Sequence, residues 1–214
     1  MADNLICLDF YGLPGSGKTV ISHKIAGDLR GRGYCVEEAS YRIDSKSCRL
    51  ARIVVKTWYS VCLMMGHSRV YKAISRKVRE CGYKGLERFV QKVNLLYKFH
   101  YLLSLRSGVL VFDEGIVQSC ISLSALGKKP ARELFDFFRE FFPQMEYQAI
   151  KIDSSIEKAL ENMASRQGKD SRVERLEDHS DRTRLLALMQ KEVESFDDIC
   201  SDVLSKFETN YQIK

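Results

Sequence analysis

The sequence lacks any uninterrupted apolar run long enough to cross a membrane. A membrane-spanning helix needs about 20 consecutive apolar residues, and the longest candidates are broken by Arg, Lys or Ser. Residues 1–4 carry no basic residue and lead directly into a strand-like run, so we expect no secretory signal peptide. There is also no internal repeat and no low-complexity linker. These absences favour one soluble domain, residues 1–214, with a well-buried core.

Patterns typical of disulfide frameworks and zinc sites are absent too. The seven cysteines are odd in number and form no C-x-x-C pair. They are Cys7, Cys35, Cys48, Cys62, Cys81, Cys120 and Cys200. The four histidines lie far apart in the sequence, which argues against a metal role. This usage indicates reduced thiols and a cytoplasmic location.

The strongest signal is the stretch Gly-Leu-Pro-Gly-Ser-Gly-Lys-Thr at residues 12–19. It matches the phosphate-binding pattern G-x-x-x-x-G-K-[ST] at every fixed position. An apolar, strand-forming run precedes it at residues 5–11, and apolar residues at helical spacing follow it. The order strand, glycine loop, helix is the context that this motif requires. The alternative, a glycine-rich turn with a solvated lysine, does not explain that context.

Each residue type in the loop has a physical role in binding a triphosphate. Glycines let the backbone approach the ligand, and successive N–H groups form an anion site at a helix N-terminus. The lysine carries a mobile positive charge to the β- and γ-phosphates, and the threonine hydroxyl can ligate Mg²⁺. The predicted nucleotide-binding residues are Gly12, Gly15, Ser16, Gly17, Lys18 and Thr19.

Strand-like and helical segments alternate along the chain. Strands are predicted at residues 5–11, 34–40, 109–112, 147–153 and, at the sheet edge, 211–213. After the helix that follows the loop, helices are predicted at 48–65, 68–79, 86–103, 116–126, 131–142, 155–165 and 181–207. This alternation predicts an α/β fold with a doubly wound parallel sheet. Because ligands bind at the carboxyl ends of such strands, we expect residues 12–19, 37–42 and 113–115 to converge.

Two adjacent carboxylates end the strand at 109–112. Asp113 stands where a Walker B carboxylate belongs, and it could hold Mg²⁺ through water or accept a proton from an attacking hydroxyl. Glu114 beside it and Glu38 at the end of the second strand are further candidate bases. A helix N-cap followed by a first-turn acid explains the Asp113-Glu114 pair as well, and the two roles can coexist.

An arginine-rich loop follows the helix predicted at 155–165. Arg166 and Arg172 lie in it, together with Gly168. Guanidinium groups on a mobile loop can close over a triphosphate and stabilise charge on the transferring group, so we interpret residues 166–178 as a lid. A solvated surface loop is the alternative.

The net charge of +6 is unevenly distributed. Residues 42–106 contain 15 Lys or Arg and three acidic residues, a local charge of +12, whereas the rest contains 19 basic and 25 acidic residues. A basic section in a nucleotide-binding protein predicts an anionic acceptor, or contact with nucleic acid or an anionic surface. A solvated helix face explains the same pattern.

These pieces together resemble the thymidylate-kinase-like group of P-loop nucleotide and nucleoside kinases. The loop G-L-P-G-S-G-K-T matches that family's phosphate loop, and residues 109–127 look like its strand ending in Asp-Arg, followed by a Ser-rich helix. Residues 150–174 are similar to its strand, helix and lid. The resemblance implies a three-layer fold with sheet order 2-3-1-4-5 and phosphoryl transfer from ATP. It also implies that Lys18, Arg166 and Arg172 contact the donor phosphates.

The sequence departs from the family at two places. Asp113-Glu114 replaces the family's Asp-Arg, and Ser171 separates Asp170 from Arg172. In the family that Arg helps to hold an acceptor phosphate. Glu114 therefore weakens the case for a nucleoside monophosphate and suits deprotonation of an alcohol. Residues 42–106 carry no family motif, yet they occupy the position of the acceptor-binding helices.

The sequence therefore predicts an ATP- and Mg²⁺-dependent kinase of a small acceptor, which could be a nucleoside, a nucleotide or another hydroxyl compound. The predicted catalytic residues are Lys18, Asp113, Glu114, Arg166 and Arg172, and the predicted metal ligands are Thr19 and Asp113. Apolar helix stripes leave room for a homodimer.

Two other functions stay open. A P-loop NTPase switch or motor would suit the Asp113-Glu114 pair, but the chain has no N-K-x-D, no D-x-x-G after the strand and no LSGGQ-like sequence. A polynucleotide-directed kinase or binder would use the basic segment 42–106, and its affinity would fall steeply with salt.

Overall fold

The first apolar run forms β1 (Leu5–Gly12), a central strand of a parallel sheet. The computed structural model describes residues 4–44, 49–125, 129–165, 173–176 and 178–197. Its strands lie in the order β2-β3-β1-β4, with β2 at Val36–Glu38, β3 at Gly108–Phe112 and β4 at Glu146–Ile152. Cys7 of β1 lies opposite Leu110 of β3 and Tyr147 of β4. The fifth strand predicted at 211–213 lies outside the described residues, so the five-strand order stays a prediction.

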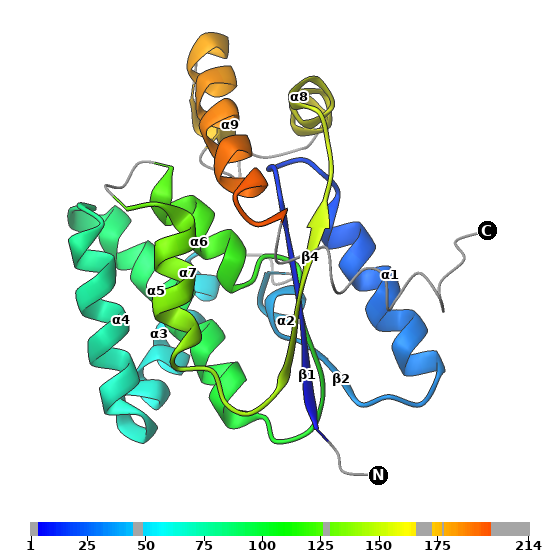
Figure 1. The fold of residues 1–214 in the computed structure, drawn as a ribbon, viewed down its shortest axis with the longest axis vertical. Helices are drawn as coiled ribbons and strands as arrows, with labels where there is room; N and C mark the ends of the chain where they lie inside the picture. The colour runs from blue at the N-terminus through cyan, green and yellow to red at the C-terminus, as the bar shows by residue number, and fades with distance from the viewer. Residues whose placement is uncertain (1–3, 45–48, 126–128, 166–172, 177, 198–214) are drawn as a thin grey trace.

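Alternate residues of the central strands face two layers of helices. Leu8 and Phe10, with two valines of β3, pack on Ala26 and Leu29 of α1 (Lys18–Gly31). Cys7 and neighbouring apolar residues on the opposite face join a larger core. Figure 1 shows α1 on one side of the strands and α5, α6 and α7 on the other. The described residues thus form three layers with a buried parallel sheet between helices, the α/β arrangement that the alternating pattern predicts.

The remaining helices complete the larger layer and the carboxyl end of the sheet. They are α2 (Ala39–Asp44), α3 (Arg49–Gly66), α4 (Ser68–Glu80), α5 (Gly85–Ser104), α6 (Ile116–Ser124), α7 (Ala131–Arg139), α8 (Ile156–Ala164) and α9 (His179–Glu194). A short 3₁₀ turn, η1, covers Val173–Arg175. In Figure 1, α8 and α9 lie beyond the carboxyl end of β1, above the other helices. This end of the sheet is where the predicted site belongs.

The helical prediction for residues 45–106 is confirmed over the described part, which forms α3, α4 and α5. The periodic apolar positions of α5 predict a core-facing stripe of Leu86, Phe89, Val93, Leu96, His100 and Leu103. Val93 and Leu96 are buried, but the prediction is wrong at the start of the helix, where Leu86 and Phe89 are exposed. None of the described helices combines the length and the apolar character needed to cross a bilayer.

Several predicted boundaries are wrong. The second strand, predicted at 34–40, spans only Val36–Glu38, because Ala39 and Ser40 turn inward and begin the unpredicted helix α2. Helix α7 ends at Arg139 rather than at 142, since the N–H groups of Phe141 and Phe142 bond three residues back. Helix α9 starts at His179, two residues early, because the Asp178 side chain caps it. The α-helix ends at Glu194, and residues 198–207 of the predicted helix lie outside the described residues.

Candidate functional site

The loop between β1 and α1 has the backbone that its glycines predict. Gly12, Gly15 and Gly17 adopt φ angles of 148°, 86° and 91°, a region that favours glycine. A Cβ atom at Gly12 would overlap the carbonyl oxygen of Ile152 in β4, and one at Gly15 would overlap the carbonyl oxygen of Ala159 in α8. Glycine is therefore required at these two positions both by the turn and by the close approach of neighbouring backbone.

Two polar side chains from distant segments hold this loop in place. The N–H of Gly12 donates to Oε1 of Gln118 in α6 at 3.0 Å. The side-chain amide of Asn162 in α8 donates to the carbonyl oxygen of Gly15 at 2.8 Å. Neither residue was predicted from the sequence, because neither belongs to a motif and each contact joins segments more than 100 residues apart. These two hydrogen bonds join the loop to α6 and α8.

The Lys18 side chain lies along the inside of the loop. It is buried, and its Nζ donates to the carbonyl oxygens of Gly12 at 3.1 Å and Leu13 at 2.8 Å. The buried hydroxyl of Ser16 has no hydrogen-bond partner within the part of the chain that the structure describes. A lysine cation and a hydroxyl in a glycine loop at a helix N-terminus fit the phosphates of a nucleotide.

Thr19 and Asp113 meet although 94 residues separate them. Thr19 Oγ1 donates to Oδ2 of Asp113 at 2.9 Å, because β3 lies beside β1 and both residues follow the carboxyl ends of their strands. The second carboxylate oxygen of Asp113 is buried and has no hydrogen-bond partner among the described residues. Mg²⁺ prefers oxygen ligands of this kind and is usually bound by one or two protein oxygens plus phosphates and water. The two predicted ligands therefore fit a magnesium ion.

A buried carboxylate, Asp9 of β1, contacts the segment that follows Asp113. Its Oδ2 accepts hydrogen bonds from the N–H of Val117 at 3.0 Å and from the hydroxyl of Tyr147. A Cβ atom at Gly115 would overlap this carboxylate. Burial raises the pKa of the Asp9 carboxyl, while the hydrogen bonds from Tyr147 and Val117 act to lower it. Asp9 thereby joins the central strand to the start of α6.

A buried lysine, Lys98 of α5, holds the same segment from the other side. Its Nζ donates to the carbonyl oxygen of Gly115 at 3.0 Å and to Oγ of Ser119 at 2.6 Å. Burial lowers the pKa of the Lys98 ammonium, and the carboxylates of Glu114 and Asp9 oppose that shift. The turn that carries Asp113 and Glu114 is therefore held between β1 and the helical segment 85–104. Sequence reasoning missed this role, because Lys98 is one of many basic residues in segment 42–106.

The third candidate base, Glu38, is occupied by contacts with α1. Its carboxylate lies 2.8 Å from Nδ1 of His23 and 2.6 Å from a guanidinium nitrogen of Arg30. The neighbouring Glu37 pairs instead with Arg42 of α2, because successive strand residues point to opposite faces. Glu114, in contrast, is exposed. Of the predicted bases, Glu114 is the one that is exposed to solvent.

Tyrosines from α3 and α5 gather near the site with a lysine. The hydroxyl of Tyr101 donates to that of Tyr59 at 3.2 Å, and Nζ of Lys56 lies 4.9 Å from the ring centre of Tyr97. Tyr97 also shares a 3.4 Å hydrogen bond with Ser40 of α2. Burial raises the pKa of the Tyr101 hydroxyl, which therefore stays protonated near neutral pH. The inner face of segment 42–106 thus presents hydroxyls, aromatic rings and a cation beside the ends of β2 and β3.

Most of the predicted lid lies outside the described residues. This applies to both of its predicted catalytic residues, Arg166 and Arg172. From residue 173 the chain is anchored to α9, because Nε of Arg182 donates to the carbonyl oxygen of Leu176 at 2.6 Å. The roles of the two arginines stay predictions.

No protein-family model matches the chain, and no curated protein sequence matches it. The solved structures that are similar to it include two at low identity. One is deoxyadenosine kinase from M. mycoides, solved with dCMP and dCDP, with 17% identity, a TM-score of 0.45, and coverage of 90% of this chain and 82% of that chain. The other is the crystal structure of APE1195, with 18% identity, a TM-score of 0.41, and coverage of 77% and 69%. The assignment of function therefore rests on the geometry of the site.

Proposed function

We propose that this protein is an ATP- and Mg²⁺-dependent phosphotransferase that acts on a hydroxyl group of a small acceptor. The single observation that carries the proposal is the 2.9 Å contact between Thr19 and Asp113 at the mouth of the glycine loop. This contact supports the proposal, because a hydroxyl and a carboxylate this close together can both bind one metal ion.

The donor side is formed by the loop itself. Backbone N–H groups at the helix end of the loop and the ammonium of Lys18 bind the phosphates, and Thr19 and Asp113 hold Mg²⁺. Bound ATP with its Mg²⁺ supplies the γ-phosphoryl group and an ion that offsets its charge. In this proposal Lys18 exchanges its contacts with the Gly12 and Leu13 carbonyls for contacts with phosphate oxygens. The arginines of the lid, Arg166 and Arg172, would neutralise the remaining charge.

The acceptor side is formed by Glu114 and the inner face of α3 and α5. Asp113 is turned toward Thr19, so its neighbour Glu114 is the carboxylate placed to accept the proton of the acceptor hydroxyl. Lys98 holds the carbonyl of Gly115, the residue after Glu114, and so supports the turn that carries this carboxylate. Tyr59 and Lys56, which are half-buried, would contact the acceptor itself. Their hydroxyl, ring and positive charge suit a nucleoside-like or anionic molecule.

The test is a screen of hydroxyl-bearing metabolites for release of ADP, with Mg²⁺ and with the metal chelated. We expect ADP to form only with Mg²⁺ and in proportion to one acceptor. Lys18→Ala should abolish this turnover. Steady ATP hydrolysis without any acceptor would indicate an NTPase switch instead, and phosphorylation of oligonucleotide ends would indicate a polynucleotide kinase.

A further inference from the structure

Helix α3 carries a stripe of large apolar side chains on its outer face. Leu50, Val54, Trp58 and Met65 are 65–80% exposed, and Val61 lies between the last two. Their spacing of three and four residues puts them on one face of the helix, over a length of about 22 Å. Isolated exposed apolar residues are normal on a protein surface, but a continuous row along a helix marks an interaction surface.

The opposite face of α3 is already used inside the protein. Leu63 and Ser60 are buried, and Tyr59 contacts Tyr101 and His100 of α5. The helix therefore does not need its outer stripe in order to pack. The stripe contributes nothing to the proposed phosphoryl-transfer site either, because Lys56 and Tyr59 approach that site from the inner face.

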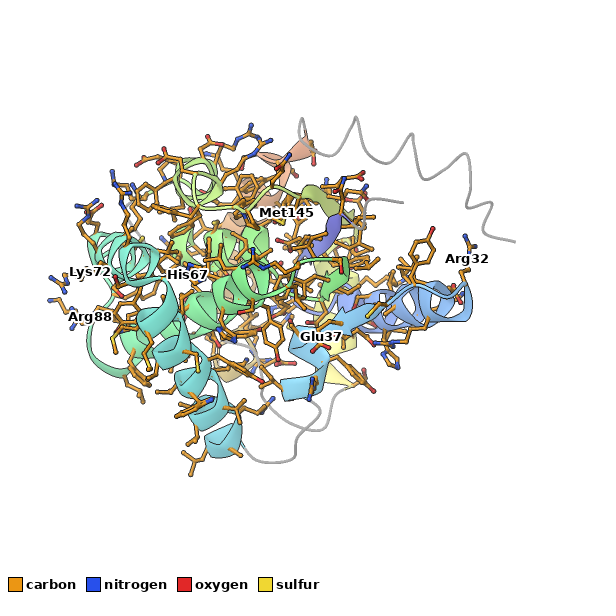
Figure 2. The ribbon with its side chains drawn as sticks, turned by 90° about the horizontal axis from the view of Figure 1, so that it is seen from below. Arg32, Glu37, His67, Lys72, Arg88 and Met145 are labelled. Carbon is orange, nitrogen blue, oxygen red and sulfur yellow. The ribbon has the colours of Figure 1, made fainter. Side chains whose placement is uncertain are left out.

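The surroundings of the stripe are strongly basic. Residues 45–79 contain no acidic residue and nine Lys or Arg. Arg69, Lys72 and Arg79 of α4 are exposed, as is Arg88 of α5. Figure 2 shows Lys72 and Arg88 pointing outward on the side of the molecule where α3 and α4 meet near His67. Exposed positive charge thus lies on α4 and α5, the helices that pack beside α3.

An apolar row together with exposed basic residues on the adjacent helices fits one kind of partner. A second copy of the chain would bring two basic surfaces together, which like-charge repulsion opposes. A nucleic acid would satisfy the basic side chains but would leave Leu50, Val54 and Met65 against phosphates. The surface of an anionic membrane satisfies both sets, since apolar side chains enter the boundary between headgroups and acyl chains and basic ones bind the headgroups.

We propose that the outer face of α3, together with the exposed basic residues of α4, docks the protein onto an anionic phospholipid membrane. The helix lies in the plane of the interface and does not cross the bilayer. Trp58 sits in the middle of the stripe, and tryptophan is a residue that favours the headgroup level. This inference is independent of the proposed function, and its test needs no activity.

The experiment uses the full chain and the fluorescence of Trp58, which is the protein's single tryptophan. Vesicles of phosphatidylcholine are compared with vesicles in which about 30% of the lipid is phosphatidylserine, because anionic headgroups attract basic segments. We expect sedimentation with the anionic vesicles only, a shift of Trp58 emission to shorter wavelength, and quenching by lipids brominated on the acyl chain. Raising the salt concentration should weaken the binding.

Matched variants distinguish the contribution of the apolar stripe of α3 to vesicle binding from that of the basic residues of α4. Val54→Asp with Met65→Asp should lower vesicle binding at least about tenfold, since both charges would enter an apolar layer. Leu188→Asp, an exposed apolar position on α9, is the control and should bind normally. Lys72→Glu should weaken binding about fivefold or more, whereas Lys24→Glu on α1 should not. Unchanged thermal melting of each variant shows that the fold is retained.

Four results would overturn the proposal. They are absence of binding to anionic vesicles, equal binding to both vesicle types, binding without any change in Trp58 emission, and wild-type binding by the Val54→Asp, Met65→Asp double variant and by Lys72→Glu. A shift of Trp58 emission that depends on protein concentration without lipid would instead assign the stripe to a second copy. A shift produced by an oligonucleotide would assign it to nucleic acid.

Discussion

The carboxylate of Asp9 fills the space that a side chain at Gly115 would occupy. Asp9 lies within the central strand, and Gly115 is the N-cap of α6, directly after Asp113 and Glu114. The position of the two candidate catalytic carboxylates therefore depends on a residue that belongs to no motif.

Gly115→Ala should lower the free energy of unfolding by about 1–3 kcal/mol, because its methyl group would overlap a buried carboxylate that Val117 and Tyr147 hold in place. Equilibrium unfolding in urea measures this. Gly27→Ala is the matched control, since a Cβ atom there meets nothing within 4 Å and helical alanine is favoured by about 1 kcal/mol. Equal stability of the two variants would show that the Asp9 carboxylate is not fixed against Gly115.

The features that the sequence predicts are formed by residues that are close together in the chain. The glycine loop, the strand before it and the helix after it share one continuous stretch, so a motif and a periodic pattern were enough to predict them. The approach of Asp113 to Thr19 was also predictable, because parallel strands end at the same edge of a sheet.

The features that were missed depend on contacts between distant segments. Asp9 sits in an apolar run, and only the fold shows that Tyr147, 138 residues away, shares a hydrogen bond with it. The same applies to Gln118 and Asn162, which hold the loop. Glu38 could be named as a strand-end carboxylate, but its partners on α1 depend on which side of β2 it faces.

The contact between Thr19 and Asp113 predicts how ATP binding depends on Mg²⁺. Asp113→Asn and Thr19→Val should each weaken the binding of Mg²⁺-ATP by at least about tenfold, since each removes an oxygen that can ligate the metal. Binding of ATP with the metal chelated should change little. Isothermal titration calorimetry with and without Mg²⁺ measures both quantities.

Two conservative changes serve as controls for this prediction. Thr19→Ser keeps the hydroxyl and should retain the Mg²⁺ dependence. Asp28→Asn removes an exposed carboxylate from α1 and should have no effect. If Thr19→Val binds Mg²⁺-ATP as tightly as Thr19→Ser, the hydroxyl does not ligate the metal.

Glu114→Gln should lower kcat, whereas Glu38→Gln should lower the free energy of unfolding. Once an acceptor is known, Glu114→Gln should lower kcat by about 10²- to 10⁴-fold with little change in Mg²⁺-ATP affinity, because a positioned base is lost. Glu38→Gln should leave kcat unchanged and lower the free energy of unfolding by about 1 kcal/mol, since its contacts with Arg30 and His23 are structural. A large loss of kcat in Glu38→Gln alone would assign the base to Glu38.

Substitution of Lys98 should lower turnover without weakening nucleotide binding. Lys98→Met removes the hydrogen bonds to Gly115 and Ser119, so the turn that carries Glu114 is held less firmly. We expect kcat to fall about tenfold and the Kd of Mg²⁺-ATP to change by less than about twofold. Lys129→Met, at an exposed pair with Glu133, is the control. An equal loss in both parameters would mean that Lys98 supports the fold as a whole.

The buried carboxyl of Asp9 predicts a dependence of stability on pH. Burial raises its pKa above the ordinary value of 3.8, so between pH 3.8 and the raised pKa the folded state binds more protons than the unfolded state. Within that window stability falls as pH rises, and above it the loss stays constant. Asp9→Asn removes the titrating group and can keep acceptor and donor atoms in place.

Relative to Asp9→Asn, the wild type should therefore lose stability as pH rises from about 4, and the difference should then level off. Urea unfolding of both proteins at several pH values between 4 and 8 measures it, with Asp28→Asn as the exposed control. If the wild type instead becomes more stable relative to Asp9→Asn as pH rises, the sign is opposite to the one expected. It would mean that Lys98 and the hydrogen bonds from Val117 and Tyr147 outweigh burial, and that Asp9 is a stabilised anion beneath the candidate catalytic turn.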